Sequence, residues 1–296
     1  MGVQCKNVYR SRTDLYLRGY VIMIGQAQLL KQIDQLIMDM DLPRFTIIIG
    51  PAGSGKKLLA SYICDTIGYT SVCCENKVEE VRNIIELSYK QNQPTIYYYP
   101  NADGMSIASK NALLKVTEES PQNSYFIMCI SSDSKTLPTI LSRGQRFYMQ
   151  PYSYMELYTY AKDAQKLKEK EAKIAAEVCN NPGQINTLSE NSITEFYKFA
   201  ESIVENIGQT ELFNILKVTK RFKLGNKTEG WDLGLFIQLI QYICVKKYKE
   251  TKNVIYYKAI NECCLNYSQE LNINGINTSM LLDSFLLKLG DILYLI

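Results

Sequence analysis

The stretch FTIIIGPAGSGKKLLA, residues 45–60, decides the fold. It begins with a short, unbroken run of apolar and β-branched residues that ends at Gly50, a pattern typical of a parallel strand buried on both faces. A glycine-rich turn follows, and the residues after it predict a helix over residues 56–67. A strand, a glycine-rich loop and a helix in this order indicate a phosphate-binding loop.

The loop has the pattern Gly50-x-x-x-x-Gly55-Lys56. Glycines let successive main-chain N–H groups and the helix N-terminus face an anion, while the lysine reaches the terminal phosphates. We therefore expect ATP or ADP as the candidate ligand, and the alternative is a glycine-rich turn without a ligand. The candidate binding residues are Gly50, Gly53, Ser54, Gly55, Lys56 and Lys57.

The groups that hold magnesium in such loops are missing. Lys57 stands where a Ser or Thr hydroxyl is expected. The strand predicted over residues 95–100 ends in Pro100 and Asn101, where a metal-binding carboxylate is expected. Asp103 follows two residues later, and we interpret it as a cap of the next helix. The sequence therefore predicts a degenerate site with weak Mg²⁺ binding.

Strands and helices alternate through the first half of the chain. This alternation indicates an α/β domain with a parallel sheet and right-handed crossovers. After Pro151 no run of strand length recurs, so the rest is expected to be all-helical. Besides those named above, we predict strands over residues 124–131 and 145–150. We predict helices over residues 26–41, 78–90, 106–120, 154–179, 210–222, 231–249, 254–271 and 279–296, with a further helix or two between the break at residues 180–183 and about Glu205.

Composition sets broad limits on the protein class. A chain of 296 residues that is 46% hydrophobic suits two or three domains with real cores. Its formal charge of +3 is spread along the chain, which permits a nucleic-acid partner without arguing for one. The N-terminus has no signal-peptide run and no stretch is long and apolar enough to span a membrane, so we expect a cytoplasmic protein. Nine cysteines without zinc-binding spacing, and no histidine, predict buried thiols and no zinc.

Residues 111–147, NALLKVTEESPQNSYFIMCISSDSKTLPTILSRGQRF, resemble the core of the bacterial DNA polymerase III clamp-loader subunits, most of all the delta-prime type. The segment IGQAQLLKQIDQLI, residues 24–37, and the phosphate loop agree with that family in order and spacing. The resemblance runs from about Ile24 to Gln150.

This resemblance implies an AAA+ protein of three parts. These are a RecA-like nucleotide-binding domain over residues 1–150, a small helical lid over residues 151–205, and an all-helical collar for oligomerisation over residues 206–296. The implied partners are other subunits of a clamp-loader ring, an ATPase of the gamma or tau type and a delta-like subunit. The sliding clamp and primer–template DNA would be contacted through the assembled complex.

Arg143 is the catalytic residue that the resemblance implies. Clamp-loader subunits complete a neighbour's ATPase site with the arginine of a Ser-Arg-Cys motif, matched here by Ser142 and Arg143 with Gly144 in place of the cysteine. In the lid, Gln184 stands where active members have a basic residue that touches the phosphates. We therefore expect a delta-prime-like subunit that donates Arg143 in trans and hydrolyses little or no ATP itself.

Two other functions stay open at this point. The chain could be an active ATPase subunit of a clamp loader, like gamma or tau, or of a helicase loader. It could also be a structural ring subunit in which Arg143 forms only a surface salt bridge. For Lys246, Lys247 and Lys249 a solvated helix face is the simpler interpretation than contact with DNA phosphates.

Overall fold

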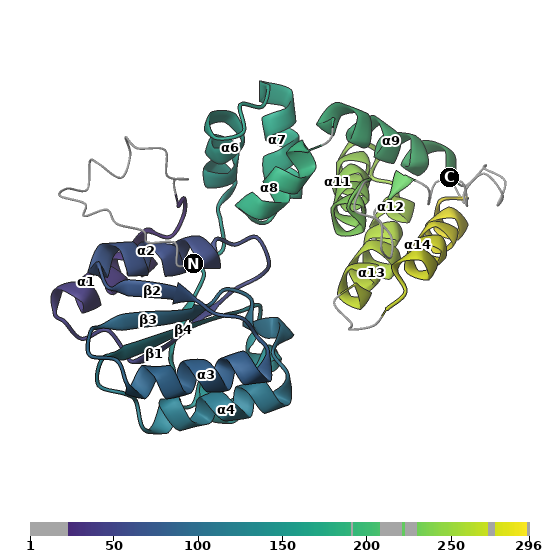
Figure 1. The fold of residues 1–296 in the computed structure, drawn as a ribbon. Helices are drawn as coiled ribbons and strands as arrows, with labels where there is room; N and C mark the ends of the chain where they lie inside the picture. Colours follow the sequence, from purple (N-terminus) through teal and green to yellow (C-terminus); the bar gives the residue numbers. More distant parts are fainter. Residues whose placement is uncertain (1–22, 191, 208–220, 223–229, 272–275, 295–296) are drawn as a thin grey trace. The chain divides into compact units, whose positions relative to one another are not determined.

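The structure is a computed structural model that describes residues 23–190, 192–207, 221–222, 230–271 and 276–294 (Figure 1). The chain forms two compact units, Met1–Tyr152 and Ser153–Ile296, which are described separately below. The division of the second unit into a lid and a collar stays a prediction.

The first unit is built on a parallel sheet of five strands in the order β2-β3-β4-β1-β5. The predicted α/β class and the four predicted strands are therefore confirmed. Strand β2 was not predicted, because it is a short edge strand whose side chains are exposed or half-buried and so lack a buried apolar pattern. The strands are β1 Phe45–Ile49, β2 Thr70–Cys73, β3 Thr95–Tyr99, β4 Ser124–Ile130 and β5 Gln145–Tyr148.

Helices cover both faces of this sheet (Figure 1). Side chains of α1 and α2 share one apolar cluster with the sheet, whereas side chains of α3, α4 and α5 share the cluster on the other face. Each predicted helix of this unit is present. The four predicted helices are α1 Ala27–Met38, α2 Lys56–Ile67, α3 Val78–Tyr89 and α4 Ile107–Glu118, and a short helix, α5 Pro138–Leu141, was not predicted.

Strand β1 lies in the middle of the apolar core. All five of its side chains are buried, and its neighbours are β4 and β5. Ile48 faces the cluster with α1 and α2, whereas Ile47 and Ile49 face the cluster with α3 and α4. Because the strands are parallel, the carboxyl ends of β1, β3 and β4 lie at one edge of the sheet, where ligands of such sheets bind.

Gly144, between α5 and β5, lies directly against β1. A Cβ atom at this position would be 2.6 Å from Cδ1 and 2.8 Å from Cγ1 of Ile47, and 3.0 Å from Cδ1 of Phe45. Such distances are too short for carbon atoms, so a side chain here forces the core to shift. The glycine that replaces the expected cysteine is therefore matched to the bulky side chains of β1.

The second unit is helical throughout its described residues, apart from a single bridge between Phe222 and Trp231. The predicted change of character after residue 151 is confirmed for these residues, while the helix predicted over residues 210–222 lies almost wholly outside them. Helices α12 and α13 flank a π-helical segment, Ile260–Cys264, in which both cysteines are buried. The helices are α6 Tyr154–Asp163, α7 Glu169–Val178, α8 Pro182–Ser189, α9 Ile193–Asn206, α11 Leu233–Thr251, α12 Val254–Ala259, α13 Leu265–Glu270 and α14 Thr278–Leu293.

Several sequence-based expectations concern cysteines, metals and membranes. Among the described cysteines Cys73 is exposed and the others are buried, so the prediction of buried thiols is wrong at Cys73. The described part of the chain contains no cluster of three His, Cys, Asp or Glu side chains that could hold a metal ion. None of the helices formed by the described residues has the length and apolar character needed to cross a bilayer.

We predict that Gly144→Ala lowers the free energy of unfolding by about 1–3 kcal/mol, because the added methyl group overpacks the core beside Ile47. Chemical denaturation of both proteins measures the difference. In an Ile47→Ala background the same substitution should cost much less, since the contacting atoms are gone. Equal costs in the two backgrounds would contradict this packing argument.

Candidate functional site

The phosphate loop starts at a fixed point on the sheet. The N–H group of Gly50 donates to the carbonyl of Ile130 at 3.1 Å, which joins the ends of β1 and β4. A Cβ atom on Gly50 would lie 2.7 Å from both Cβ and Cγ of Met149, in the segment that follows β5. A glycine is therefore required for the chain to leave β1 at this place.

Two further glycines shape the loop. Gly53 and Gly55 have φ values of 80° and 90°, in the left-handed region that glycine adopts at little cost. Gly55 is the N-cap of α2, and no side chain caps this helix. The first N–H groups of α2 are therefore left without a capping side chain, which suits an anion.

Ser54 supplies a buried hydroxyl inside the loop. The residue is 2% exposed, and its Oγ has no hydrogen-bond partner. This Oγ would lie 2.9 Å from a Cβ atom on Gly50, so it points into the turn of the loop. The Ser54 carbonyl accepts a hydrogen bond from Tyr152 Oη at 2.8 Å, which holds the loop from outside. Because an unpaired buried hydroxyl is costly, a small shift of the loop that brings it to a phosphate oxygen would be stabilising.

Lys56 folds back on the loop. Its Nζ donates to the carbonyls of Gly50 at 2.6 Å and Pro51 at 2.8 Å. Burial lowers the pKa of Lys56 from its ordinary value, while the neighbouring Cys129 and Asp103 act in the opposite direction. Because the ammonium group is only half-buried and is bound to carbonyls of the loop itself, a rotation of the Lys56 side chain can bring Nζ to a phosphate group at the loop. Together with Ser54 and the glycines, it fits the phosphate groups of a nucleotide.

The residues that would contact a metal ion do not fit Mg²⁺. Lys57 is exposed in the first turn of α2, and an ammonium group has hydrogen atoms to donate but no lone pair to offer. Asn101 follows β3 and carries no charge. Magnesium in nucleotide sites is held by carboxylate or hydroxyl oxygens together with phosphate oxygens. Lys57 and Asn101 supply neither.

Asp103 has a role that the sequence analysis did not foresee. The predicted cap of α4 is wrong, because the side chain of Ser106 is the N-cap of that helix and accepts from the Ser109 N–H. Both carboxylate oxygens of Asp103 instead accept from the N–H of Ser131, at 2.9 Å and 3.1 Å. This contact ties the turn after β3 to the end of β4. A carboxylate therefore lies at the same sheet edge as the phosphate loop.

Arg143 lies on the surface just after α5. Its Nη1 donates to the carbonyl of Thr139 at 2.9 Å, and its Nη2 forms an ion pair with Glu118 Oε1 at 3.0 Å. The two side chains are 38% and 54% exposed, so this ion pair is solvated and weak. The guanidinium group is positioned by its own unit and remains accessible.

Two further polar residues, Ser132 and Gln184, have local partners. Ser132 Oγ hydrogen-bonds with Ser134 Oγ, 2.8 Å away. In the second unit, the N–H of Gln184 donates to the capping Asn181 Oδ1 at 3.0 Å, and Gln184 Oε1 accepts from the Asn180 N–H at 2.7 Å. Gln184 therefore serves the start of α8.

Three contacts of the first unit were not predicted from the sequence. The thiol of Cys129 is buried beneath the start of α2 and donates to the Lys56 carbonyl, and burial raises its pKa to about 12. The side chain of Gln26 exchanges two hydrogen bonds with the main chain of Gln150 at 2.8 Å and 2.9 Å. The third is the Glu118 partner of Arg143. Each joins elements far apart in the sequence, so no local pattern could reveal it.

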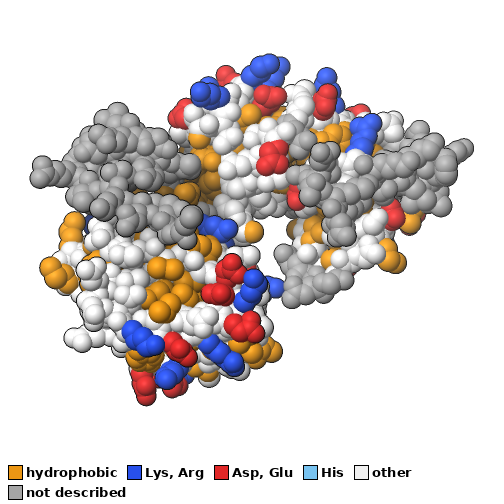
Figure 2. Space-filling view, viewed as in Figure 1, with side chains coloured by type: hydrophobic (Ala, Val, Ile, Leu, Met, Phe, Trp, Pro, Cys, Tyr) orange, Lys and Arg blue, Asp and Glu red, His pale blue; other side chains and the backbone are white. Residues whose placement is uncertain are grey.

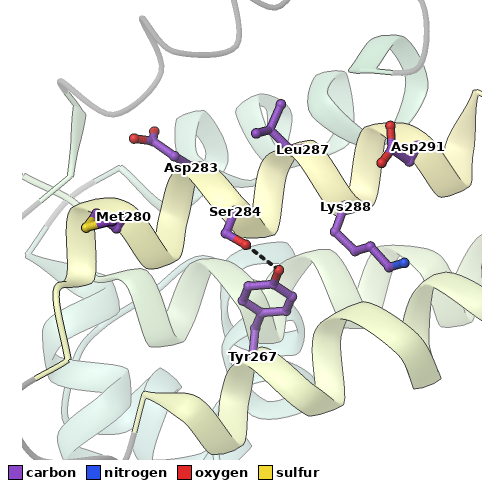
Figure 3. Close-up of a pocket in the computed structure, with 7 residues that line it drawn as sticks. All are labelled: Tyr267, Met280, Asp283, Ser284, Leu287, Lys288 and Asp291. Carbon is purple, nitrogen blue, oxygen red and sulfur yellow. Dashed lines mark hydrogen bonds between the residues drawn. The ribbon is translucent and has the colours of Figure 1, made fainter.

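An open pocket on the second unit does not gather any predicted site residue (Figure 3). It lies between α13 and α14, where Tyr267 Oη and Ser284 Oγ hydrogen-bond at 2.7 Å. Its lining mixes acidic, basic and apolar side chains. The lining residues are Tyr267, Met280, Asp283, Ser284, Leu287, Lys288 and Asp291.

Charged side chains form no large single-sign patch on the face shown in Figure 2, where basic and acidic groups are interspersed. Lys247 on α11 forms an ion pair with Glu205 on α9, in agreement with a solvated helix face. This arrangement gives no argument for a direct nucleic-acid interface.

The parallel sheet, the glycine loop before α2 and the helical second unit form the RecA-like architecture seen in AAA+ proteins. A RuvB mutant from Thermotoga maritima has the same fold, with a TM-score of 0.50 and 13% identity over 92% of this chain and 89% of that one. At this identity the likeness concerns the fold alone.

Within this class, the chain is similar to DNA polymerase III clamp-loader subunits, as its sequence predicts. Residues 67–153 match the profile of the family described as "DNA polymerase III, delta subunit". The delta′ subunit of Buchnera aphidicola subsp. Baizongia pistaciae is 38% identical over 68 residues, 23% of this chain and 20% of that protein. The gamma subunit of Buchnera aphidicola subsp. Schizaphis graminum is 26% identical over 171 residues, 47% of each protein.

These similarities cover part of each protein. The chain spans between 20% and 47% of the length of the curated relatives it matches, and these relatives include delta′, gamma and tau subunits. The predicted resemblance to clamp-loader subunits is confirmed. The similarities do not distinguish a delta′ subunit from a gamma or tau subunit.

We predict that Asp103→Ala lowers the free energy of unfolding by about 1 kcal/mol, because the Ser131 N–H loses its acceptor. Faster amide hydrogen exchange at Ser131 provides a local readout. Asp103→Asn, which keeps one acceptor oxygen, should restore most of the protection. Unchanged exchange at Ser131 in Asp103→Ala would contradict the assignment of this contact.

The N-cap of α4 gives a separate prediction. Ser106→Ala should lower the free energy of unfolding by about 1 kcal/mol, as loss of an N-cap does.

Proposed function

We propose that the chain is a delta-prime-like subunit of the DNA polymerase III sliding-clamp loader. In this proposal it joins an AAA+ ring in the cytoplasm, donates Arg143 to a neighbouring ATPase site and hydrolyses little ATP itself. Its partners are ATPase subunits of the gamma or tau type and a delta-like subunit. The assembled complex, rather than this chain alone, contacts the sliding clamp and primer–template DNA during replication.

The observation that carries the proposal is the contrast between two parts of the first unit. The guanidinium group of Arg143 is accessible and is held in place by Glu118 and the Thr139 carbonyl. The chain's own loop has Lys57 and Asn101 where metal ligands are expected. In this proposal Arg143 acts on a neighbour, while the groups expected to hold a metal ion in the chain's own site are replaced. An arginine supplied in trans stabilises the charge that develops on transferred phosphate, worth about 10³–10⁵ in rate.

Exposed apolar side chains on α14 support a role in assembly. Met280, Leu287 and Tyr294 are 69%, 38% and 72% exposed and recur every seven residues. This spacing keeps them on one side of the helix, as in helices that pack against a partner. We propose that the helical region over residues 206–296 is the collar through which ring subunits associate, and that residues 151–205 form the lid.

One observation favours the alternative of an active ATPase subunit. Asp103 supplies a carboxylate at the sheet edge that holds the phosphate loop. Such a group could take part in metal binding in a gamma- or tau-like subunit or a helicase loader. ATP turnover by the purified chain alone, lost in Lys56→Ala, would favour this alternative over the proposal.

We predict that Arg143→Ala lowers the ATPase rate of the assembled complex by about 10³–10⁵, while the complex still assembles. The tagged chain is captured from its native cells, the co-purifying ATPase is identified by mass spectrometry, and the complex is rebuilt from purified subunits. Arg143→Lys should be nearly as slow, because an ammonium group cannot replace the planar fork of a guanidinium group.

Arg146 supplies a matched control, since it is an exposed arginine on β5 three residues away. Arg146→Ala should leave the rate of the complex within about twofold, as expected of a surface substitution. If Arg143→Ala behaves like this control, the chain is a purely structural ring subunit and the proposal is wrong.

A further inference from the structure

Two replacements at the phosphate loop change its charge in the same direction. Lys57 stands where a neutral hydroxyl is expected, which adds one positive charge. Asn101 stands where a carboxylate is expected, which removes one negative charge. The loss of metal ligands is therefore accompanied by a gain of positive charge at the loop, while the Asp103 carboxylate remains at the same edge of the sheet.

The phosphate-binding part of the loop is nevertheless complete. The Ser54 hydroxyl is buried, lacks a hydrogen-bond partner and points into the loop. Gly53 and Gly55 keep the left-handed backbone that such a loop needs, and no side chain caps α2. A loop that had lost all ligand binding would have no need of an uncapped helix and an unpaired buried hydroxyl at the same place, since both lower stability.

The charge of Lys57 acts on this part of the loop. Burial is the main influence on the pKa values of Lys56 and Cys129, lowering the first and raising the second. Beside burial, the positive charge of Lys57 acts to lower both pKa values and the negative charge of Asp103 acts to raise them, so both charged groups lie near the start of α2. An anion at that helix end would feel the attraction of Lys57, strengthened by the helix dipole.

We infer that the loop binds the polyphosphate group of a nucleotide without Mg²⁺, with the Lys57 ammonium group supplying the positive charge that the metal ion supplies in other loops of this type. Without a metal ion to polarise the terminal phosphate and orient the attacking water, such a site holds its nucleotide and does not hydrolyse it. The nucleotide then serves as a structural ligand of the first unit. This inference does not depend on whether Arg143 serves a neighbour.

Isothermal titration calorimetry of the full chain with ATP tests the inference in two buffers, one with EDTA and one with excess Mg²⁺. We expect the dissociation constants in the two buffers to agree within about twofold. In EDTA, Lys57→Ser should bind ATP about threefold to tenfold more weakly, the range for loss of one partly exposed charged contact. Added Mg²⁺ should restore part of this loss, because the new hydroxyl can act as a metal ligand.

Two further variants make the outcomes distinct. Lys90→Ser removes an exposed lysine on the opposite face of the sheet and should leave ATP binding unchanged. Arg143→Ala should also leave it unchanged, so failure here and failure of the proposed function are separate results. Binding that requires Mg²⁺ and is lost in Asp103→Asn would overturn the inference in favour of a metal site at Asp103. No measurable ATP binding, or equal binding by Lys57→Ser in EDTA, would overturn it as well.

Discussion

The burial of β1 on both faces is the constraint on which the rest of the first unit depends. The strand lies between β4 and β5, and helices pack on it from both sides. Two segments that pass close to β1 or its end therefore have no room for a side chain. Gly50 is required where the loop leaves the strand beside Met149, and Gly144 is required where the chain passes Ile47. This packing determines where the phosphate loop begins and where the segment after Arg143 passes β1.

The carboxyl edge of the sheet then brings together groups that are far apart in the sequence. The loop after β1, the Ser131 N–H after β4 and the Asp103 carboxylate after β3 meet there because the strands are parallel and adjacent. On the chain's surface, Glu118 at the end of α4 forms an ion pair with Arg143, which lies between α5 and β5. The first group lies where parallel sheets of this kind bind ligands. The second presents an accessible cation to whatever lies outside the unit.

Local patterns were sufficient to predict much of this architecture. The apolar run of β1, the glycine loop and the periodicity of α2 gave these elements nearly residue by residue, because each has a strong local signal. Strand β2 had no such signal, since it is short and lies at the sheet edge. The role of Asp103 was predicted wrongly, because a carboxylate just before a helix resembles a cap while its actual partner, Ser131, lies 28 residues away. Contacts of this kind are set by strand order, which spacing in the sequence does not encode.

The most direct test of the account is a cryo-EM structure of the complex assembled with this chain and an ATP transition-state analogue. The quantity to measure is the distance between the guanidinium group of Arg143 and the terminal phosphate group of the nucleotide bound to the neighbouring subunit. If Arg143 acts in trans, this distance is a hydrogen-bond distance and the ion pair with Glu118 is broken. Arg143 still paired with Glu118, with no neighbouring nucleotide facing it, would contradict the central claim.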